Sequence, residues 1–358
     1  MDLTSFSKQP IKELKKILKE NNLSVLGSKV DLSMRIFYFY FWNLHRNTQI
    51  SIYCYDDKHG WGRDFLKILT EHHFSCYLFS NAKDVPDSIS TFVYMHPDHL
   101  HNRELDREII NFFQKFRFSQ FIPSLMELLV YDEKISQSQL FSKWLPKTWY
   151  LKSEDSAKSM LRNIKLPIIS KSNEGAASSN VRLLMSNSDA KKEINMIFNG
   201  NGIPRYSKHH ETGLFQEKYL LWQEFLHGNT NDWRVIMLGQ KYAWILKRYN
   251  REDMPFASGS NKSSPILNLD SEIIEILNYT FDFVYENNLN FTGIDLIRDS
   301  SMELKILETT TGWGTKSYSS RVFERLEDGE WRPTIFKGRD QWKIASLAVA
   351  GMIEKSIL

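Results

Sequence analysis

The stretch TGIDLIRDSSMELKILETT, residues 292–310, places two acidic residues inside runs that otherwise predict β-strands. A turn over Ser300–Glu303 would set Asp295 directly opposite Glu308, where like charges repel each other. Thr310 would share the face of Glu308, because side chains alternate along a strand. Two carboxylates held together share a proton or bind a cation, and magnesium prefers one or two carboxylates with water and phosphate oxygens. The alternative is a surface hairpin in another register, with both acids in solvent.

The composition is that of an ordinary globular protein. The 358 residues are 42% hydrophobic and 25% charged, enough for two or three domains. The longest apolar run, Ile36–Trp42, is too short to span a bilayer, and the first ten residues lack the pattern of a secretory signal. Cys54 and Cys76 have no metal-binding spacing, which favours a reducing compartment and no structural zinc. We expect a soluble cytoplasmic protein without membrane contact; the sequence does not indicate its oligomeric state.

The body of the chain combines two kinds of sheet. Strands alternate with helices between residues 49 and 116, which predicts a parallel α/β layer. After a helix and Pro146, strands joined by a small-residue loop follow, and residues 219–250 predict strands of an antiparallel sheet. A helix over residues 271–287 precedes the acidic hairpin, and an amphipathic helix over residues 341–357 closes the chain.

A small-residue loop is the first candidate phosphate site. Lys171 ends a predicted strand just before SNEGAASSN, residues 172–180, so its ammonium can meet phosphate where backbone N–H groups of the loop converge. Lys134 begins the preceding predicted helix. This is not a G-x4-G-K-[ST] loop, and a small-residue loop alone is weak support for a phosphate site.

Charged residues on the later strands form a second candidate site. Asp232, Arg234 and Arg248 alternate with apolar residues, which places them on one face of a sheet. Arg248, Arg251 and the ASGS segment, residues 257–260, can hold anionic groups through guanidinium or backbone N–H donors. Each of these residues taken alone can equally be a solvated surface residue.

In this order, these features resemble the ATP-grasp superfamily of carboxylate–amine ligases over about residues 48–355. The likeness is closest to the glutathione synthetase and RimK-type branch, in which a QEF(I/L)-x-G…D-x-R-V stretch recurs. Here that stretch is Gln223, Glu224, Phe225, Leu226, Gly228, Asp232, Arg234 and Val235. The resemblance implies a mixed α/β and α+β fold. A parallel layer (residues 47–125) would precede a central lobe with the phosphate-covering loop (126–220) and a C-terminal lobe with the magnesium site (221–358), and the two lobes would clasp ATP.

The resemblance implies roles in nucleotide binding and catalysis. Lys134 and Lys171 would contact ATP phosphates and adenine, the backbone of Glu224–Leu226 the adenine edge, and Asp232 the ribose. Arg248 would stabilise the transferring phosphoryl group. The other implied residues of the nucleotide and catalytic site are Gly175, Ser178, Ser179, Gln223 and Arg234.

The resemblance also implies metal and substrate ligands. Asp295 and Glu308 would bind magnesium, with Glu308 bridging two ions. Thr310 would be the third ligand, although many members of the superfamily have asparagine there, and the loop is poorer in glycine than many. These departures leave room for a degenerate enzyme. The implied substrate-binding residues are Arg251, Ser258, Gly259, Ser260 and Lys316.

The predicted function is that of an ATP- and magnesium-dependent ligase. A carboxylate would attack the γ-phosphate to give an acyl phosphate, and an amine would then displace phosphate, with Lys, Arg and Mg²⁺ positioning and neutralising the reacting groups. A kinase that phosphorylates a hydroxyl or carboxylate is one alternative. A non-catalytic, DNA-tethered protein that binds ATP is another.

The first 46 residues form a separate basic module. They hold eight lysine and arginine residues against four acidic ones, a net charge of +4, whereas the remainder has a net charge of −1. Residues 3–42 resemble the SAP motif, a DNA-binding helix–loop–helix unit, through Leu14, Leu18, Asn22, Leu23, Gly27, Lys29, Leu32 and Arg35. The candidate nucleic-acid contacts are Lys12, Lys15, Lys16, Lys29 and Arg35. The resemblance favours DNA over RNA; the alternative is a helical hairpin whose lysines merely face solvent. Nucleic acid, or a molecule bound to it, could then be the substrate.

Overall fold

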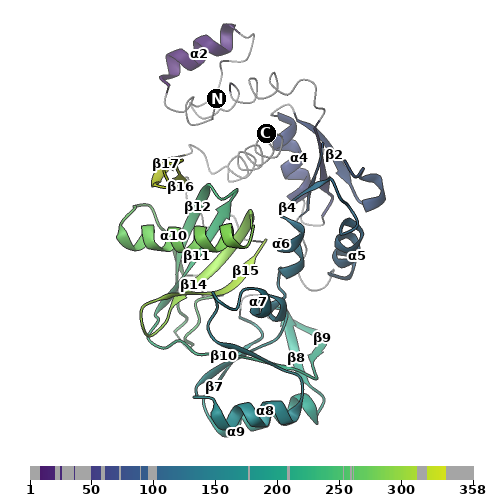
Figure 1. Cartoon of the computed structure of the whole chain (residues 1–358), viewed down its shortest axis with the longest axis vertical. Helices are drawn as coiled ribbons and strands as arrows, with labels where there is room; N and C mark the ends of the chain where they lie inside the picture. Colours follow the sequence, from purple (N-terminus) through teal and green to yellow (C-terminus); the bar gives the residue numbers. More distant parts are fainter. Residues whose placement is uncertain are drawn as a thin grey trace.

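A computed structural model of the chain describes residues 9–20, 25, 36, 50–57, 61–71, 74–88, 90–95, 103–175, 178–207, 210–252, 254–258, 260, 262–312 and 321–335. Figure 1 shows a parallel sheet layer beside two further lobes built on antiparallel sheets. The predicted mixed fold class is confirmed. The predicted site residues Lys29, Arg35, Gly259 and Lys316, and the helix expected over residues 341–357, lie outside the described residues.

The first layer is the predicted parallel α/β layer. Its strands are β1 (Ser51–Tyr55), β2 (Ser75–Phe79), β3 (Thr91–Tyr94) and β4 (Gln120–Ile122), in the order β2-β1-β3-β4, with helices α4 (Trp61–Glu71), η1 (Ala82–Asp84) and α5 (Arg103–Phe113). All three strand pairs are parallel. A side chain at Gly62 would place Cβ 1.7 Å from the Tyr55 carbonyl oxygen, so glycine lets α4 begin directly against the end of β1.

Two short helices connect this layer to the rest of the molecule: α6 (Leu125–Val130) and α7 (Lys134–Leu140). Leu128 packs into the core of the parallel layer, whereas Val130 and Phe141 pack into the core under the C-terminal sheet. Val130, Phe141, Trp144 and Leu145, which the sequence assigned to the central lobe, therefore share a hydrophobic core with the C-terminal lobe.

The central lobe is an antiparallel sheet with two helices on one face. Its strands are β5 (Thr148–Leu151), β6 (Ile168–Lys171), β7 (Val181–Leu184) and β10 (Leu220–Glu224), in the order β5-β10-β6-β7; its helices are α8 (Glu154–Asn163) and α9 (Asn187–Phe198); and its hairpin is β8 (Ile203–Ser207) with β9 (His210–Gln216). Ser153 and Ser186 cap the two helices in capping boxes. Because β10 pairs with β5 and β6, it belongs to this lobe and not to the C-terminal lobe predicted from residue 221.

The C-terminal lobe is a larger antiparallel sheet. Its strands are β11 (Asn231–Leu238), β12 (Tyr242–Tyr249), β13 (Ser263–Pro265), β14 (Phe291–Arg298), β15 (Leu304–Thr310), β16 (Arg321–Arg325) and β17 (Trp331–Ile335), in the order β15-β14-β11-β12-β16-β17, with β13 also paired to β12. Helix α10 (Ser271–Glu286), capped by Asp270, packs over one face (Figure 1). The opposite face is left for the polar residues Asp232, Arg248 and Asp295, which all line one cleft.

The β14–β15 hairpin brings Asp295 opposite Glu308, as the sequence predicts, but through a different register. Near the turn, Leu304 pairs with Arg298, one residue earlier than the simple hairpin requires. A bulge at Leu307 then restores the expected pair, because Leu307 has no direct partner on β14. Hence the acidic pair depends on an irregularity of the strand as well as on the turn.

Helix α2 (Ile11–Glu20) is the described part of the basic module. Leu14 and Leu18 are buried, whereas Ile11, Lys12, Lys15 and Lys16 are exposed, which makes the helix amphipathic. Across the described ranges, no helix has the length and apolar character that a membrane span needs.

Candidate active site

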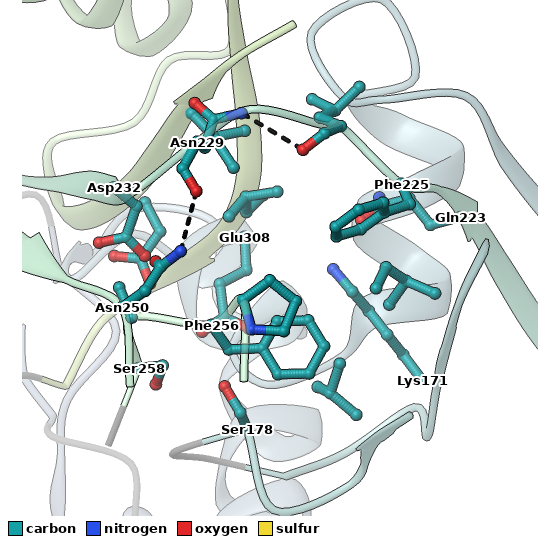
Figure 2. A pocket seen from close by; sticks show the side chains of 18 of the residues that line it. Lys171, Ser178, Gln223, Phe225, Asn229, Asp232, Asn250, Phe256, Ser258 and Glu308 are labelled. Atoms are coloured by element: carbon teal, nitrogen blue, oxygen red, sulfur yellow. Dashed lines mark hydrogen bonds between the residues drawn. The ribbon is translucent and has the colours of Figure 1, made fainter. Parts of the chain in front are cut away.

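A cleft lies between the central and C-terminal sheets (Figure 2). Its volume is about 890 Å³, including the part open to solvent. Of the predicted site residues, those that line it are Lys134, Lys171, Gly175, Ser178, Gln223, Glu224, Phe225, Leu226, Asp232, Arg248, Ser258, Asp295 and Glu308. The predicted residues Ser179, Arg234, Arg251, Ser260 and Thr310 do not line it.

Lys171 ends β6 with its ammonium directed into the cleft, between Phe225 and Glu308 (Figure 2). The residue is only 9% exposed, and within the described residues its ammonium has no ion pair or hydrogen bond. Burial lowers the pKa of Lys171 to about 8, with the charge of Glu308 opposing and that of Lys134 reinforcing the shift. A buried cation without a counter-ion is unfavourable, so this position favours an anionic ligand.

Lys134, the first residue of α7, also lines the cleft. Its Nζ lies 3.1 Å from Asp132 Oδ1 and donates to the Gly175 carbonyl oxygen at 2.8 Å. The same Nζ lies 3.6 Å from Glu308 Oε2. Lys134 therefore links the small-residue loop to the strand that carries Glu308.

The small-residue loop is fastened at both ends. Asn173 accepts a hydrogen bond from the Ile135 N–H at 2.8 Å, and its own carbonyl accepts from the Lys134 N–H at 2.9 Å. Gly175 has a φ of +135°, and a Cβ there would lie 2.4 Å from Asn180 Nδ2, so the loop needs glycine at this point. Asn180 in turn binds the backbone of Tyr206 in β8. These anchors place Ser178 at the cleft wall.

Two arginines and two aspartates form a buried cluster on the C-terminal side. Arg234 donates to both oxygens of Asp295 at 2.7 and 2.8 Å, and Arg248 donates to both oxygens of Asp232 at 2.6 and 2.7 Å. Arg248 also lies 2.8 Å from Asp295 Oδ2. Arg234, which does not line the cleft, therefore positions Asp295 and is not placed to meet a ligand there. Asp232, predicted to hold ribose, uses both oxygens for Arg248.

The cluster shifts the pKa values of its two aspartates in opposite directions. Burial raises the pKa of Asp295, but the charges of Arg234 and Arg248 outweigh burial and bring the pKa to about 2. Burial raises the pKa of Asp232 to about 6, against the opposing charge of Arg248. Asp295 is consequently ionised throughout the physiological range.

The acidic pair has the donor chemistry of a magnesium site. Asp295 and Glu308 are directly opposed and both line the cleft, and carboxylate oxygens are the ligands that Mg²⁺ prefers. The Thr310 hydroxyl instead donates to the Gly312 carbonyl at 2.8 Å and accepts from the Gly312 N–H at 3.1 Å, so its placement does not support the predicted third ligand. No cluster of three or more metal-binding side chains occurs in the part of the chain that the structure describes. Water or phosphate oxygens would have to complete the coordination.

Comparison with known proteins gives structural neighbours only. No family model and no curated protein sequence matches the chain. The ATP-grasp ligase PsnB, solved with a minimal precursor, is 11% identical with a TM-score of 0.51 over 87% of this chain and 99% of its own. The macrocyclase MdnC from Microcystis aeruginosa MRC, bound with the precursor peptide MdnA, is 12% identical with a TM-score of 0.50 over 86% and 99%. D-alanine–D-alanine ligase from Bacillus anthracis, complexed with ATP, is 11% identical with a TM-score of 0.50 over 86% and 96%.

This chain has the ATP-grasp fold. Its two antiparallel lobes meet at the end of β10 and the residues that follow it, where Glu224, Phe225 and Leu226 line the cleft. Gln223 Nε2 donates to Thr148 Oγ1 at 2.9 Å, which fixes the side chain at the start of that segment. Phe225 and Phe256 supply apolar surface on either side of the space into which Lys171 points (Figure 2).

The predicted substrate residues are only partly at the ATP-grasp cleft. Ser258 lines it, and Arg251 donates to the Ser258 carbonyl from Nε at 3.1 Å and Nη2 at 2.6 Å. Arg251 thus shapes the segment before position 259. Ser260 accepts a hydrogen bond from the Lys262 N–H at 3.1 Å, which makes it part of a turn.

Several residues around the cleft were not predicted. Asp132 holds Lys134 and the Gly175 N–H, and Asn173 and Asn180 anchor the loop. Gln137 contacts the backbone of Thr309 next to Glu308. Their amide and carboxylate side chains follow no local periodicity, and the only available signal is the position of Asn173 and Asn180 at the two ends of the small-residue loop.

Proposed function

We propose that the chain is an ATP- and Mg²⁺-dependent carboxylate–amine ligase. The observation that carries the proposal is the buried Lys171, whose ammonium has no ion pair within the described part of the chain and points into the cleft that Glu308 also lines. A triphosphate with its divalent ion suits both residues, because phosphate oxygens would neutralise Lys171 and would complete the coordination of a metal ion at Glu308. The ATP-grasp fold supports the same nucleotide.

Each wall of the cleft has a distinct role in this proposal. Lys134, Lys171 and the backbone around Ser178 hold phosphate oxygens, while the segment Glu224–Leu226 and the ring of Phe256 hold the base. Magnesium, held by Asp295 and Glu308, would neutralise charge on the phosphates; we expect two ions, with Glu308 shared between them. Arg248, which lines the cleft beside Asp295, faces the transferring phosphoryl group.

The reaction is proposed to take two steps. A carboxylate oxygen of the substrate attacks the γ-phosphorus, the bond from the γ-phosphorus to the bridging oxygen breaks, and ADP leaves. An amine nitrogen then attacks the acyl carbon, the bond to phosphate breaks, and the amine proton passes to solvent or to the departing phosphate. The loop 172–180 covers the phosphate side, which protects the acyl phosphate from water.

Nucleotide binding is the first test. Magnesium with the non-hydrolysable analogue AMPPNP should raise the Tm of the protein, because a ligand that binds only the folded state stabilises it. Asp295→Asn and Glu308→Gln should remove the magnesium-dependent part of the rise. Glu286→Gln, at an exposed ion pair with Lys143, is the matched control and should leave the rise unchanged. The same rise in all four proteins would disprove the proposed site.

Product analysis separates the ligase from its rivals. With ATP, Mg²⁺ and an acceptor, mass spectrometry should find an amide together with free phosphate. A stable phosphorylated product would instead identify a kinase. Binding without any ADP release, for every acceptor tested, would favour a protein that uses ATP only as a switch.

The acceptor class we propose first is a peptide, because two of the structural neighbours were solved with a minimal precursor or a precursor peptide. A second proposal rests on α2, whose lysines Lys12, Lys15 and Lys16 face solvent opposite the buried Leu14 and Leu18. Such a helix can hold a nucleic acid, DNA before RNA, or an acceptor bound to it. Neither class follows from the fold.

Salt dependence tests the nucleic-acid proposal. Replacing Lys12, Lys15 and Lys16 by glutamine should weaken binding of a DNA duplex and make it less sensitive to salt, because fewer counter-ions are released. Replacing Lys158, Lys191 and Lys192 on the central-lobe helices removes the same charge elsewhere and serves as the control. Equal DNA binding by both triple variants would reject a role of α2.

A further inference from the structure

Gln137 lies behind the cleft wall and joins two elements of the site. It is 2% exposed and sits one turn after Lys134 on α7. Its Oε1 accepts from the Thr309 N–H at 2.9 Å, and its Nε2 donates to the Thr309 carbonyl at 3.0 Å and to the Val130 carbonyl at 2.8 Å. Gln137 does not line the cleft itself.

These hydrogen bonds fall on an edge strand. Among the described strands, β15 is the last of its sheet, so none of them pairs with the backbone groups on its outer side. At Thr309 the amide of Gln137 takes the place of that strand, since it offers one donor and one acceptor to one residue. The next residue back along β15 is Glu308. The amide therefore fixes the edge of the sheet where the acidic pair is formed.

We propose that Gln137 is a positioning residue for the magnesium site, acting through Glu308. Lys134 precedes Gln137 on the same helix, and Lys134 Nζ lies 3.6 Å from Glu308 Oε2. The buried amide of Gln137 thus sets the backbone next to Glu308, in the way that Arg234 sets Asp295 from behind. The inference rests on the proposed function, because it assumes that Glu308 binds the metal of a nucleotide.

The chemistry at this position is specific to an amide. Gln137→Glu keeps the acceptor for the Thr309 N–H but loses both donated hydrogen bonds and sets a carboxylate against two carbonyl oxygens. Gln137→Met keeps the volume and removes all three hydrogen bonds. If the buried glutamate of Gln137→Glu prevents folding, Gln137→Met still tests the loss of the hydrogen bonds.

The experiment measures ADP affinity by calorimetry, once with Mg²⁺ and once with EDTA. In Gln137→Glu and Gln137→Met, the gain in affinity that Mg²⁺ provides should fall by about tenfold, as is usual when the partner behind a metal ligand is lost. Affinity in EDTA should stay within about twofold, since the lysines and the base site are untouched. Gln240→Glu is the control, because Gln240 Nε2 also donates to a carbonyl, that of Leu289 at 3.1 Å, and Gln240 does not line the cleft.

A double variant decides whether Gln137 acts through Glu308. In a Glu308→Gln background, Gln137→Met should have little further effect on the gain from Mg²⁺, because coupled residues are not additive. Equal losses of affinity in Mg²⁺ and EDTA, or a full further loss in the double variant, would overturn the inference and leave Gln137 a structural residue. If the wild-type protein binds ADP with the same affinity in Mg²⁺ and in EDTA, the proposed function itself is wrong.

Discussion

Lys171 is the residue at which burial and charge conflict most directly. The four residues of β6 are all buried, and β10 and β7 flank the strand on both sides. Its last side chain can leave the sheet only into the cleft. There the nearest carboxylates, Asp295 and Glu308, are already engaged by Arg234, Arg248 and Lys134. An anion that enters the cleft therefore stabilises the charged form of Lys171 further.

The affinity for a phosphate ligand should depend on the charge of Lys171. Because the pKa of Lys171 in the free protein is lowered to about 8 and a bound phosphate favours the charged form, binding above that pH must take up a proton. We expect the affinity for AMPPNP with Mg²⁺ to be level below pH 8 and to fall by up to about tenfold per pH unit above it. Calorimetry in buffers of different ionisation enthalpy measures the proton uptake directly.

Lys171→Gln is the control for this pH dependence. The variant should bind AMPPNP at least about tenfold more weakly at pH 7, since a charged hydrogen bond to phosphate is lost. It should also lose the fall above pH 8. A variant that retains the fall would show that another group titrates.

At the scale of elements, local patterns in the sequence predict the sheets and the acidic pair. Alternation predicts that Asp232, Arg234 and Arg248 share a face, and the cluster with Asp295 confirms this. Simple turn arithmetic also predicts the pair of Asp295 with Glu308, although a bulge is needed to reach it. Periodicity and pairing rules therefore locate the site on the fold.

Long-range partners could not be predicted in the same way. Gln137 and Thr309 are 172 positions apart, and nothing in either segment marks the other. Residues 221–224 of β10 were assigned to the C-terminal lobe, whereas β10 pairs with strands of the central lobe. The sequence of a strand does not indicate which of two sheets the strand joins. The sequence also does not indicate that the Thr310 hydroxyl bonds Gly312 and that Thr310 does not line the cleft, since short polar side chains can bond nearby backbone groups.

The small-residue loop should depend on Asn180. This side chain donates to the Tyr206 carbonyl at 2.8 Å and accepts from the Tyr206 N–H at 2.7 Å, which ties the loop to β8. Asn180→Asp keeps the acceptor but loses the donor, so backbone amides between residues 172 and 180 should exchange hydrogen faster, and the KM for ATP should rise several-fold with a smaller change in kcat. Asn163→Asp loses a similar donated bond at the end of α8 and should change neither quantity. Unchanged exchange in Asn180→Asp would mean that the other anchors hold the loop.

At the scale of the whole molecule, α6 joins the parallel layer to the C-terminal sheet. Leu128 belongs to the core of the layer and Val130 to the core under the sheet, two residues further on. Between the two sheets, the Glu127 carboxylate accepts from the N–H groups of Asn290 at 2.7 Å and Phe291 at 2.6 Å, where β14 begins. The strand that carries Asp295 is thus attached at its start to the parallel layer.

Glu127 should consequently matter for the stability of the whole chain. Its second oxygen accepts from the Ser124 N–H at 2.7 Å, so both carboxylate oxygens face donors. In Glu127→Gln the amide nitrogen would have to face one of these N–H groups, and a buried donor without a partner costs about 1–3 kcal/mol. Urea denaturation should show that loss, whereas Glu286→Gln at the exposed pair with Lys143 should stay within about 0.5 kcal/mol of wild type. If both variants unfold at the same urea concentration as wild type, the link through Glu127 does not hold the layer to the sheet, and the two cores on α6 must suffice.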